Sequence, residues 1–303
     1  MNAEMIPLEA RDPSDTVRTV GLVKRFRKDE ALRGLDMFVP TGSVYGFIGP
    51  NGAGKTTTLK ILLNILRPTE GGAYVFGCDT QREEVAIKQR VGYLSERRSL
   101  PDFLTGVELL DCLKRMYPKW NDARVKKYVE MFKIPMNKKI SSLSLGERTK
   151  LGLTAAVVRE PDLLILDEPT NGMDPIAREL FFSALADDFG AGDKTVIIAS
   201  HILPEIERVC DSVGIISEGK LALQGSLDEL KDEYKMISFK AEGGDGLKDI
   251  REVLRTEKQE ELTVVYTRGD PQKVLSEVRK LSPAYVDVKD LSLKDIFLLS
   301  VGA

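Results

Sequence analysis

The chain alternates short apolar runs with amphipathic stretches, a pattern typical of an α/β protein. Nearly continuous apolar runs predict strands buried on both faces, and they occupy 44–48, 163–166 and 195–199. Shorter strands are predicted at 19–26 and 35–39, with turns at Gly34 and at 41–42. From about 97 to 159 the spacing of the apolar residues becomes helical, which predicts a helical subdomain.

The two ends of the chain differ from its centre. Residues 1–16 carry charges and two prolines without an apolar run, so we expect a flexible N-terminus and no signal peptide. A boundary is predicted at Gly225 and Ser226, which leaves 17–225 as the main domain. Beyond it, strands near 236–239, 262–266 and 285–288 alternate with helices near 247–256, 271–281 and 292–300. This alternation predicts a small C-terminal α/β domain over 226–303.

Composition restricts the partners. Lys and Arg total 44 against 47 Asp and Glu, a net charge of −3, which argues against a nucleic-acid partner. No apolar run approaches the roughly 18 residues of a membrane span, so we expect a cytoplasmic protein whose membrane role needs a partner. The three cysteines are far apart and His201 is the single histidine, which argues against a zinc site.

The strongest chemical signal is the segment F-I-G-P-N-G-A-G-K-T-T-T at 47–58, which contains G-x-x-x-x-G-K-[ST] between a predicted strand and a predicted helix. Its glycines leave backbone N–H groups free to surround phosphate oxygens. Lys55 is expected to reach the β- and γ-phosphates of ATP, and the Thr56 hydroxyl to bind Mg²⁺. The predicted nucleotide contacts are Gly49, Pro50, Asn51, Gly52, Ala53, Gly54, Lys55, Thr56 and Thr57.

Two carboxylates, Asp167 and Glu168, directly follow the buried strand at 163–166. Open α/β sheets bind ligands at this end of their strands, and burying paired carboxylates is costly unless a cation compensates. We interpret Asp167 as a Mg²⁺ ligand and Glu168 as the residue that orients the attacking water. His201 follows the strand at 195–199, where it either contacts the γ-phosphate or water, or is structural; the residues alone favour neither.

Two further features stay open on residue grounds. Ser144 and Glu147 form a capping box at the start of a predicted helix, which is either only a well-capped helix or an N-terminus that faces an anion. Phe26 lies within K-R-F-R-K and is either a base-stacking aromatic or a sheet residue among solvated charges.

In their order along 17–225 these motifs resemble the ATP-binding subunits of ABC transporters. The resemblance implies a P-loop NTPase (RecA-like) core with an antiparallel β-subdomain and a helical subdomain. The segment Leu143–Glu147 is similar to the L-S-G-G-Q signature of the family, which implies that Ser144, Gly146 and Glu147 contact ATP held by the opposite subunit. The resemblance implies that 171–174, which ends in Asp174, is the D-loop, that His201 is the switch histidine, and that Phe26 is the aromatic that stacks on adenine. Glu96 occupies the Q-loop position, close to Mg²⁺.

Three positions depart from the family pattern. Glu96 replaces glutamine and adds charge near phosphate, Leu145 replaces a glycine of the signature, and Asn171 replaces serine in the D-loop. These features and the short C-terminal extension are similar to a bacterial exporter subgroup. Its ATPases pair with a separate permease and handle drugs, antimicrobial peptides, lipids or polysaccharides.

The resemblance therefore implies an ATPase that works as a head-to-tail homodimer with ATP and Mg²⁺. It implies a peripheral position on the inner face of the cell membrane, through an integral membrane permease. The alternative is an ABC-type ATPase that acts on ribosomes or DNA without a permease. A single ATPase unit without sustained heptads argues against that alternative. Residues 226–303 are a candidate regulatory or dimerising module.

Overall fold

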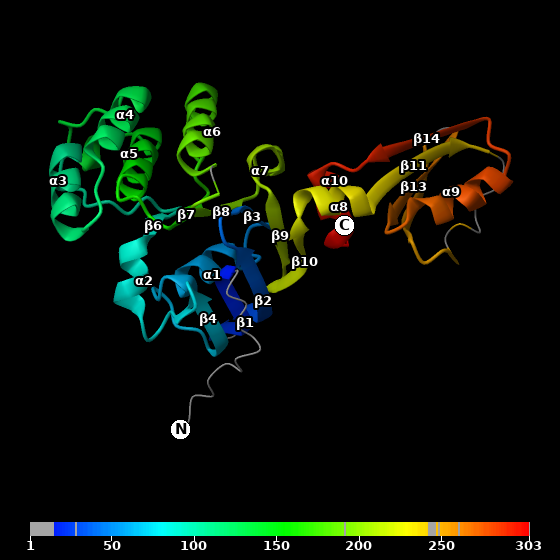
Figure 1. Cartoon of the computed structure of the whole chain (residues 1–303), viewed down its shortest axis with the longest axis horizontal. Coiled ribbons are helices and arrows are strands. Elements are labelled where there is room, and N and C mark those ends of the chain that lie inside the picture. Colours follow the sequence, from blue (N-terminus) through cyan, green and yellow to red (C-terminus); the bar gives the residue numbers. More distant parts are fainter. Residues whose placement is uncertain are drawn as a thin grey trace.

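The computed structural model describes residues 15–27, 29–190, 192–241, 247, 249–259 and 261–302. Within these ranges the chain forms three sheets (Figure 1). Most of the predicted flexible N-terminus, 1–14, lies outside the described residues.

The central sheet has the strand order β10-β9-β3-β8-β7-β6. Its strands are β3 (Val44–Ile48), β6 (Val91–Leu94), β7 (Leu163–Asp167), β8 (Thr195–Ser200), β9 (Ser212–Ser217) and β10 (Lys220–Ser226). All neighbours are parallel except β10, which is antiparallel to β9. Every residue of β7 and β8 is buried, so the strands predicted at 163–166 and 195–199 are confirmed.

Alternate residues of the central strands enter two separate cores. Leu164 and Leu166 pack in the core formed with α5 (Leu145–Val157) and α6 (Pro175–Phe189). Leu163 and Ile165 pack on the opposite side, with α1 (Lys55–Leu62) and the antiparallel strands. Burial on both faces explains why polar residues of β7 and β8 are confined to the strand ends.

The antiparallel subdomain has the order β2-β1-β4-β5 and lies beside α1 (Figure 1). Its strands are β1 (Asp15–Phe26), β2 (Asp29–Pro40), β4 (Glu70–Val75) and β5 (Cys78–Asp79). The turn predicted at Gly34 is wrong: Gly34 lies inside β2 with φ 79°, and the chain reverses after Phe26, which pairs with Asp29. Leu22 pairs with Leu35 and Val23 with Arg33, so Gly34 is the extra residue of a bulge, where a left-handed glycine serves as it does in a turn.

Helices cover the other side of the central sheet. The helical subdomain contains α3 (Gly106–Met116), α4 (Asp122–Phe132), the short η2 (Ile140–Ser142) and α5. The main domain also includes the helices α2 (Glu84–Arg90) and α7 (Leu203–Val209). Within the described ranges, no helix is both long enough and apolar enough to cross a bilayer.

The C-terminal strands form a third, antiparallel sheet in the order β12-β13-β11-β14. Its elements are α8 (Leu227–Glu233), β11 (Tyr234–Lys240), β12 (Val253–Gln259), β13 (Leu262–Arg268), α9 (Pro271–Lys280), β14 (Tyr285–Asp290) and α10 (Leu293–Ser300). The helix predicted at 247–256 is wrong, because Val253 begins the edge strand β12. Leu247, Ile250 and Val253 have helical spacing, yet they pack around the α9 core from a turn and a strand.

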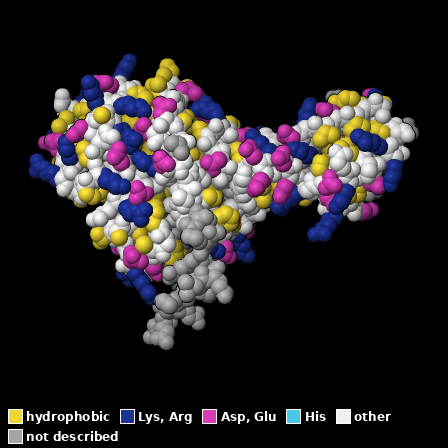
Figure 2. Space-filling view, in the orientation of Figure 1, with side chains coloured by type: hydrophobic (Ala, Val, Ile, Leu, Met, Phe, Trp, Pro, Cys, Tyr) yellow, Lys and Arg dark blue, Asp and Glu magenta, His cyan; other side chains and the backbone are white. Residues whose placement is uncertain are grey.

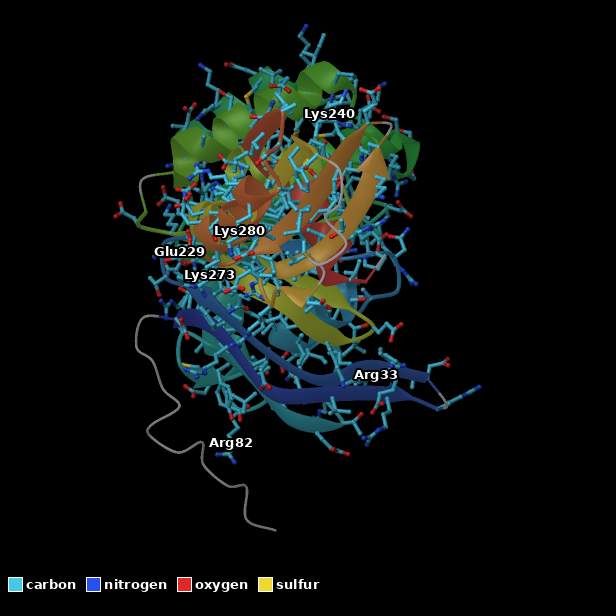
Figure 3. All side chains as sticks on the ribbon, turned by 90° about the vertical axis from the view of Figure 1, so that its right-hand side faces the viewer. Arg33, Arg82, Glu229, Lys240, Lys273 and Lys280 are labelled. Atoms are coloured by element: carbon cyan, nitrogen blue, oxygen red, sulfur yellow. The ribbon has the colours of Figure 1, made fainter. Side chains whose placement is uncertain are left out.

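This third sheet protrudes from the rest of the molecule, whereas the last helix returns to it (Figures 1 and 2). Viewed from the protruding end, Lys240, Lys273 and Lys280 lie on its surface (Figure 3). On α10, Ile296 is fully buried in the same core as Ile206 of α7. Acidic and basic side chains are interspersed over the face in Figure 2, without a large basic field.

Candidate active site

The glycine loop at 49–54 joins β3 to α1, so the first turn of α1 faces the same space as the loop. A Cβ on Gly49 would lie 2.4 Å from the carbonyl oxygen of Ile216. Gly54 has φ 113°, and its Cβ would lie 2.7 Å from Leu32. Only glycine permits this backbone path. The loop encloses a cavity of about 210 Å³, lined by Pro50, Asn51, Gly52, Gly54, Lys55, Thr56, Thr57, Glu96 and Glu168.

Lys55 folds back over the loop. Its side chain is 5% exposed, and Nζ donates to the carbonyl oxygens of Gly49 (2.6 Å) and Pro50 (3.3 Å). Nζ also lies 3.8 Å from Glu168 Oε1. Burial lowers the pKa of Lys55, while the carboxylates of Glu168 and Asp167 act in the opposite direction. The ammonium group is thus held inside the cavity by the loop carbonyls and by Glu168.

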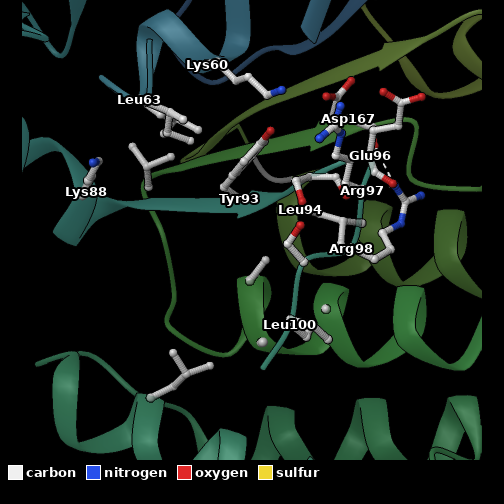
Figure 4. Close-up of a pocket in the computed structure, with 18 of the residues that line it drawn as sticks. Lys60, Leu63, Lys88, Tyr93, Leu94, Glu96, Arg97, Arg98, Leu100 and Asp167 are labelled. Atoms are coloured by element: carbon white, nitrogen blue, oxygen red, sulfur yellow. Dashed lines mark hydrogen bonds between the residues drawn. The ribbon is translucent and has the colours of Figure 1, made fainter. Parts of the chain in front are cut away.

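Thr56 and Asp167 meet where β7 ends. The Thr56 hydroxyl lies 2.9 Å from Asp167 Oδ2 and 3.1 Å from Oδ1, and Asp167 is completely buried. The pKa of Asp167 is raised to about 6, chiefly by burial; the charges of Glu96 and Glu168 also raise it, whereas the Thr56 hydrogen bond and Lys55 lower it. Figure 4 shows Asp167 at the end of β7 beside the loop that carries Glu96.

This oxygen-rich pair fits Mg²⁺. A hydroxyl and a carboxylate are ligands that Mg²⁺ prefers, and it typically takes one or two from the protein and others from substrate phosphates. The described residues contain no group of three or more His, Cys, Asp or Glu able to hold a metal by themselves. A cation here would compensate the buried charge of Asp167.

Glu168 and His201 are also brought together. Glu168 is 5% exposed and has φ 49°, an uncommon backbone conformation for a side chain of this size. Its Oε2 lies 2.9 Å from His201 Nδ1, and the His201 side chain is 47% exposed. The parallel order β3-β8-β7 places the phosphate loop, His201 and the carboxylate pair at one edge of the sheet.

The signature segment lies apart from this cavity within the chain. Ser144 Oγ accepts from the Glu147 N–H (3.2 Å) and Glu147 Oε2 from the Ser144 N–H (2.7 Å), so both side chains cap α5. A Cβ on Gly146 would lie 2.5 Å from the carbonyl oxygen of Gly172. The start of α5 therefore packs on the loop after β7.

Asp174 and Phe26 likewise do not line the cavity. Asp174 caps α6, its Oδ1 accepting from the Ala177 N–H at 2.9 Å. Phe26 ends β1, is 42% exposed, and carries Lys24 Nζ at 4.9 Å from its ring centre.

Sequence reasoning missed Arg98, which is only 3% exposed. Its guanidinium donates to the carbonyl oxygens of Glu96, Asp167 and Glu168. Arg98 stands in the run S-E-R-R, which reads as solvated, and no spacing signal distinguishes it from Arg97.

A glycine loop between a strand and a helix, with a buried carboxylate pair after a neighbouring parallel strand, defines a P-loop nucleotide hydrolase. Comparisons with known proteins make this more specific. The family described as ABC transporter matches residues 32–171. The daunorubicin/doxorubicin resistance ATP-binding protein DrrA of Streptomyces peucetius is 30% identical over 96% of this chain and 93% of its own length.

Two further matches agree. The bacitracin transport ATP-binding protein BcrA of Enterococcus faecalis is 34% identical over 75% of each chain. A solved dimeric bacterial ABC transporter cassette matches the fold with a TM-score of 0.64 and 21% identity, over 70% of this chain and 98% of the cassette. The chain belongs to the ABC transporter family, as an ATP-binding subunit with ATPase activity that powers transport.

Proposed function

We propose that this chain is the ATPase of an exporter whose transport pathway lies in a separate permease. The observation that carries the catalytic part is the joining of Lys55, Glu168 and His201 at one edge of the sheet. The relatives named for drug resistance and bacitracin transport support the exporter class.

In the proposed mechanism Lys55 turns from the loop carbonyls to the β- and γ-phosphates, which also receive the N–H groups of 49–57. Thr56 and Asp167 would hold Mg²⁺, and Glu96 of the Q-loop would add a further carboxylate to this site. When bound, Mg²⁺ neutralises charge on the phosphates. Glu168 accepts a hydrogen bond from the attacking water, and His201 fixes the direction of the Glu168 carboxylate. Little more than positioning and charge stabilisation is required for phosphoryl transfer.

We further propose a head-to-tail homodimer. Ser144 and Leu145 are exposed, and the signature does not line the ATP cavity of its own chain. A nucleotide site must be closed around its ligand, so another surface would have to cover this cavity. A second copy would bring Ser144, Gly146 and Glu147 onto the γ-phosphate, with Asp174 at the same interface. Phe26 would stack on adenine at the open side of the loop. The dimeric state of the solved cassette supports this arrangement.

The permease is proposed to dock in a groove beside the active site. This groove measures about 660 Å³ and lies between β6, α1, α3 and α5 (Figure 4). Leu94, Leu100 and Leu109 contribute apolar surface, and Lys60 and Lys88 supply positive charge. The groove shares Glu96 with the ATP cavity, so an occupant would sense the nucleotide state. Docking there would hold the ATPase on the inner face of the membrane.

The domain division at 225 remains our proposal. The third sheet and the α9 core support a small C-terminal domain over 226–303. The burial of Leu230 and Ile296 in the cassette core shows that α8 and α10 anchor this segment. The ribosome or DNA alternative finds no support in the named relatives.

Capture from detergent-solubilised membranes tests the partner. The tagged chain is expected to recover a polytopic membrane protein, and Ala155→Trp, which fills the groove, to lose it. Leu298→Trp, on the exposed side of α10, is the matched control and should retain capture. Recovery of ribosomes, or equal capture by both variants, would contradict the proposal.

A further inference from the structure

Arg98 occupies the loop that follows β6, with an almost completely buried side chain and φ 49°. Its Nη1 donates to the carbonyl oxygens of Ser95 (2.9 Å), Glu96 and Asp167 (3.3 Å), and Nη2 donates to that of Glu168. One guanidinium thus bridges the backbone of the Glu96 loop and the end of the strand that carries both active-site carboxylates.

The remaining donor of Arg98 reaches a third segment. Nε donates to Thr149 Oγ1 at 3.1 Å. The Thr149 hydroxyl in turn faces the carbonyl oxygens of Leu145 (2.8 Å) and Asn171 (3.2 Å). Thr149 is fully buried in α5, the helix capped by the signature serine.

In these contacts the buried positive charge of Arg98 is paired with carbonyl groups. Within the described residues, no carboxylate oxygen forms an ion pair with Arg98; Asp167, Glu96 and Glu168 act on it only through space. A buried guanidinium without an ion pair is costly unless hydrogen bonds compensate, and here the carbonyl groups supply that compensation. The fork geometry of arginine matches several fixed acceptors at once.

Glu168 needs such a restraint. Its left-handed backbone persists only where surrounding contacts determine it. Its N–H donates to the Ala199 carbonyl at 2.9 Å, and its own carbonyl oxygen accepts from Arg98. Both ends of this residue are thereby fixed, which sets the direction of its carboxylate.

We propose that Arg98 is a positioning residue for ATP hydrolysis, which holds the Glu168 backbone and couples it to the Glu96 loop and, through Thr149, to the signature helix. The inference rests on the proposed role of Glu168. It predicts that the signature, the Q-loop and the water-orienting carboxylate move as one unit when a second subunit engages Ser144.

The test measures kcat and ATP affinity of the full chain for Arg98→Ala, Arg98→Lys and Thr149→Val. We expect kcat to fall about tenfold or more in both Arg98 variants, with the Kd for ATP changed less than about threefold. Ethylguanidinium should restore kcat in Arg98→Ala, because it refills the space and the carbonyl contacts. Arg124→Ala is the matched control: its side chain is also mostly buried, but it faces Asp188. It should keep its kcat and gain nothing from ethylguanidinium.

The outcomes separate this inference from the proposed function. An inactive wild-type chain overturns the proposed function. An active wild type with wild-type kcat in Arg98→Lys and Thr149→Val overturns only the role of Arg98, and so does equal rescue of the Arg124 control. If Arg98→Ala fails to fold, Arg98→Lys and Thr149→Val decide: a lower kcat at unchanged affinity supports the inference, and a wild-type kcat contradicts it.

Discussion

His201 Nδ1 lies 2.9 Å from Glu168 Oε2, which joins the residue after β8 to the residue after β7. The Glu168 carboxylate therefore has two partners, Lys55 on one oxygen and His201 on the other. ATP would draw Lys55 away towards its phosphates, and His201 would then be the contact that keeps the carboxylate directed at the water.

His201→Ala is expected to lower kcat about ten- to a hundredfold, because the Glu168 carboxylate loses the side-chain contact that remains once Lys55 binds phosphate. The Kd for ATP should change little, since the phosphate loop is untouched. Steady-state ATPase assays and equilibrium binding measure both quantities. Imidazole added to the variant should recover part of the rate. An unchanged kcat would show that the 2.9 Å contact has no role in turnover.

Asp167→Asn should stabilise the protein in the absence of nucleotide and metal. Because the folded pKa of Asp167 is raised to about 6 from 3.8, its ionisation costs stability as the pH rises through that range. At about pH 7.5 the variant should gain about 1–3 kcal/mol in the free energy of unfolding, and near pH 4 almost nothing. Denaturant unfolding with EDTA at both pH values measures this, and a gain that does not depend on pH would contradict it.

Gly146→Ala should destabilise the chain, although alanine normally favours a helix by up to about 1 kcal/mol. The new Cβ would lie 2.5 Å from the Gly172 carbonyl oxygen, so the start of α5 must move from the loop after β7. We expect a loss of about 1–3 kcal/mol and a lower ATPase rate. Gly225→Ala is the control, because its nearest atom would be 3.6 Å away. Equal stability of the two variants would argue against the close contact.

Ile296→Ala should lower the free energy of unfolding of the whole chain by about 2–4 kcal/mol. Ile296 is fully buried in the core shared with α7, whereas Leu298 on the same helix is 36% exposed. Leu298→Ala should therefore cost little. If Ile296→Ala destabilises only a separate, minor unfolding transition, α10 belongs energetically to the protruding domain and not to the cassette.

Much of the fold can be predicted because buried elements have characteristic apolar patterns in the sequence. Both faces of strands β7 and β8 are buried, so their apolar runs are unambiguous. The predictions of a turn at Gly34 and of a helix at 247–256 are wrong because the local sequence at each place is compatible with two different structures. A left-handed glycine suits a bulge as well as a turn. Apolar residues three apart suit a helix, yet the free edge of β13 accepts Val253–Gln259 as a strand.

The site can be predicted from the sequence only where the topology of the sheet determines which residues lie together. Asp167 ends β7, His201 follows β8, and Lys55 begins the helix after β3; the carboxyl ends of these parallel strands meet at one edge of the sheet. Arg98 is not found by this reasoning, because its burial depends on backbone carbonyls at the end of β7 and on Thr149 of α5, which are far from it in the sequence. No local sequence pattern indicates that those hydrogen-bond acceptors surround Arg98.

The central claim is that two copies of this chain trap ATP, with Glu168 required to release it by hydrolysis. Sedimentation velocity of Glu168→Gln with Mg²⁺ and radiolabelled ATP tests it most directly. The account predicts a stable dimer that retains unhydrolysed ATP, while the wild-type chain under the same conditions turns ATP over and returns to monomer. A variant that stays monomeric with ATP bound, or that hydrolyses ATP at the wild-type rate, would contradict the account.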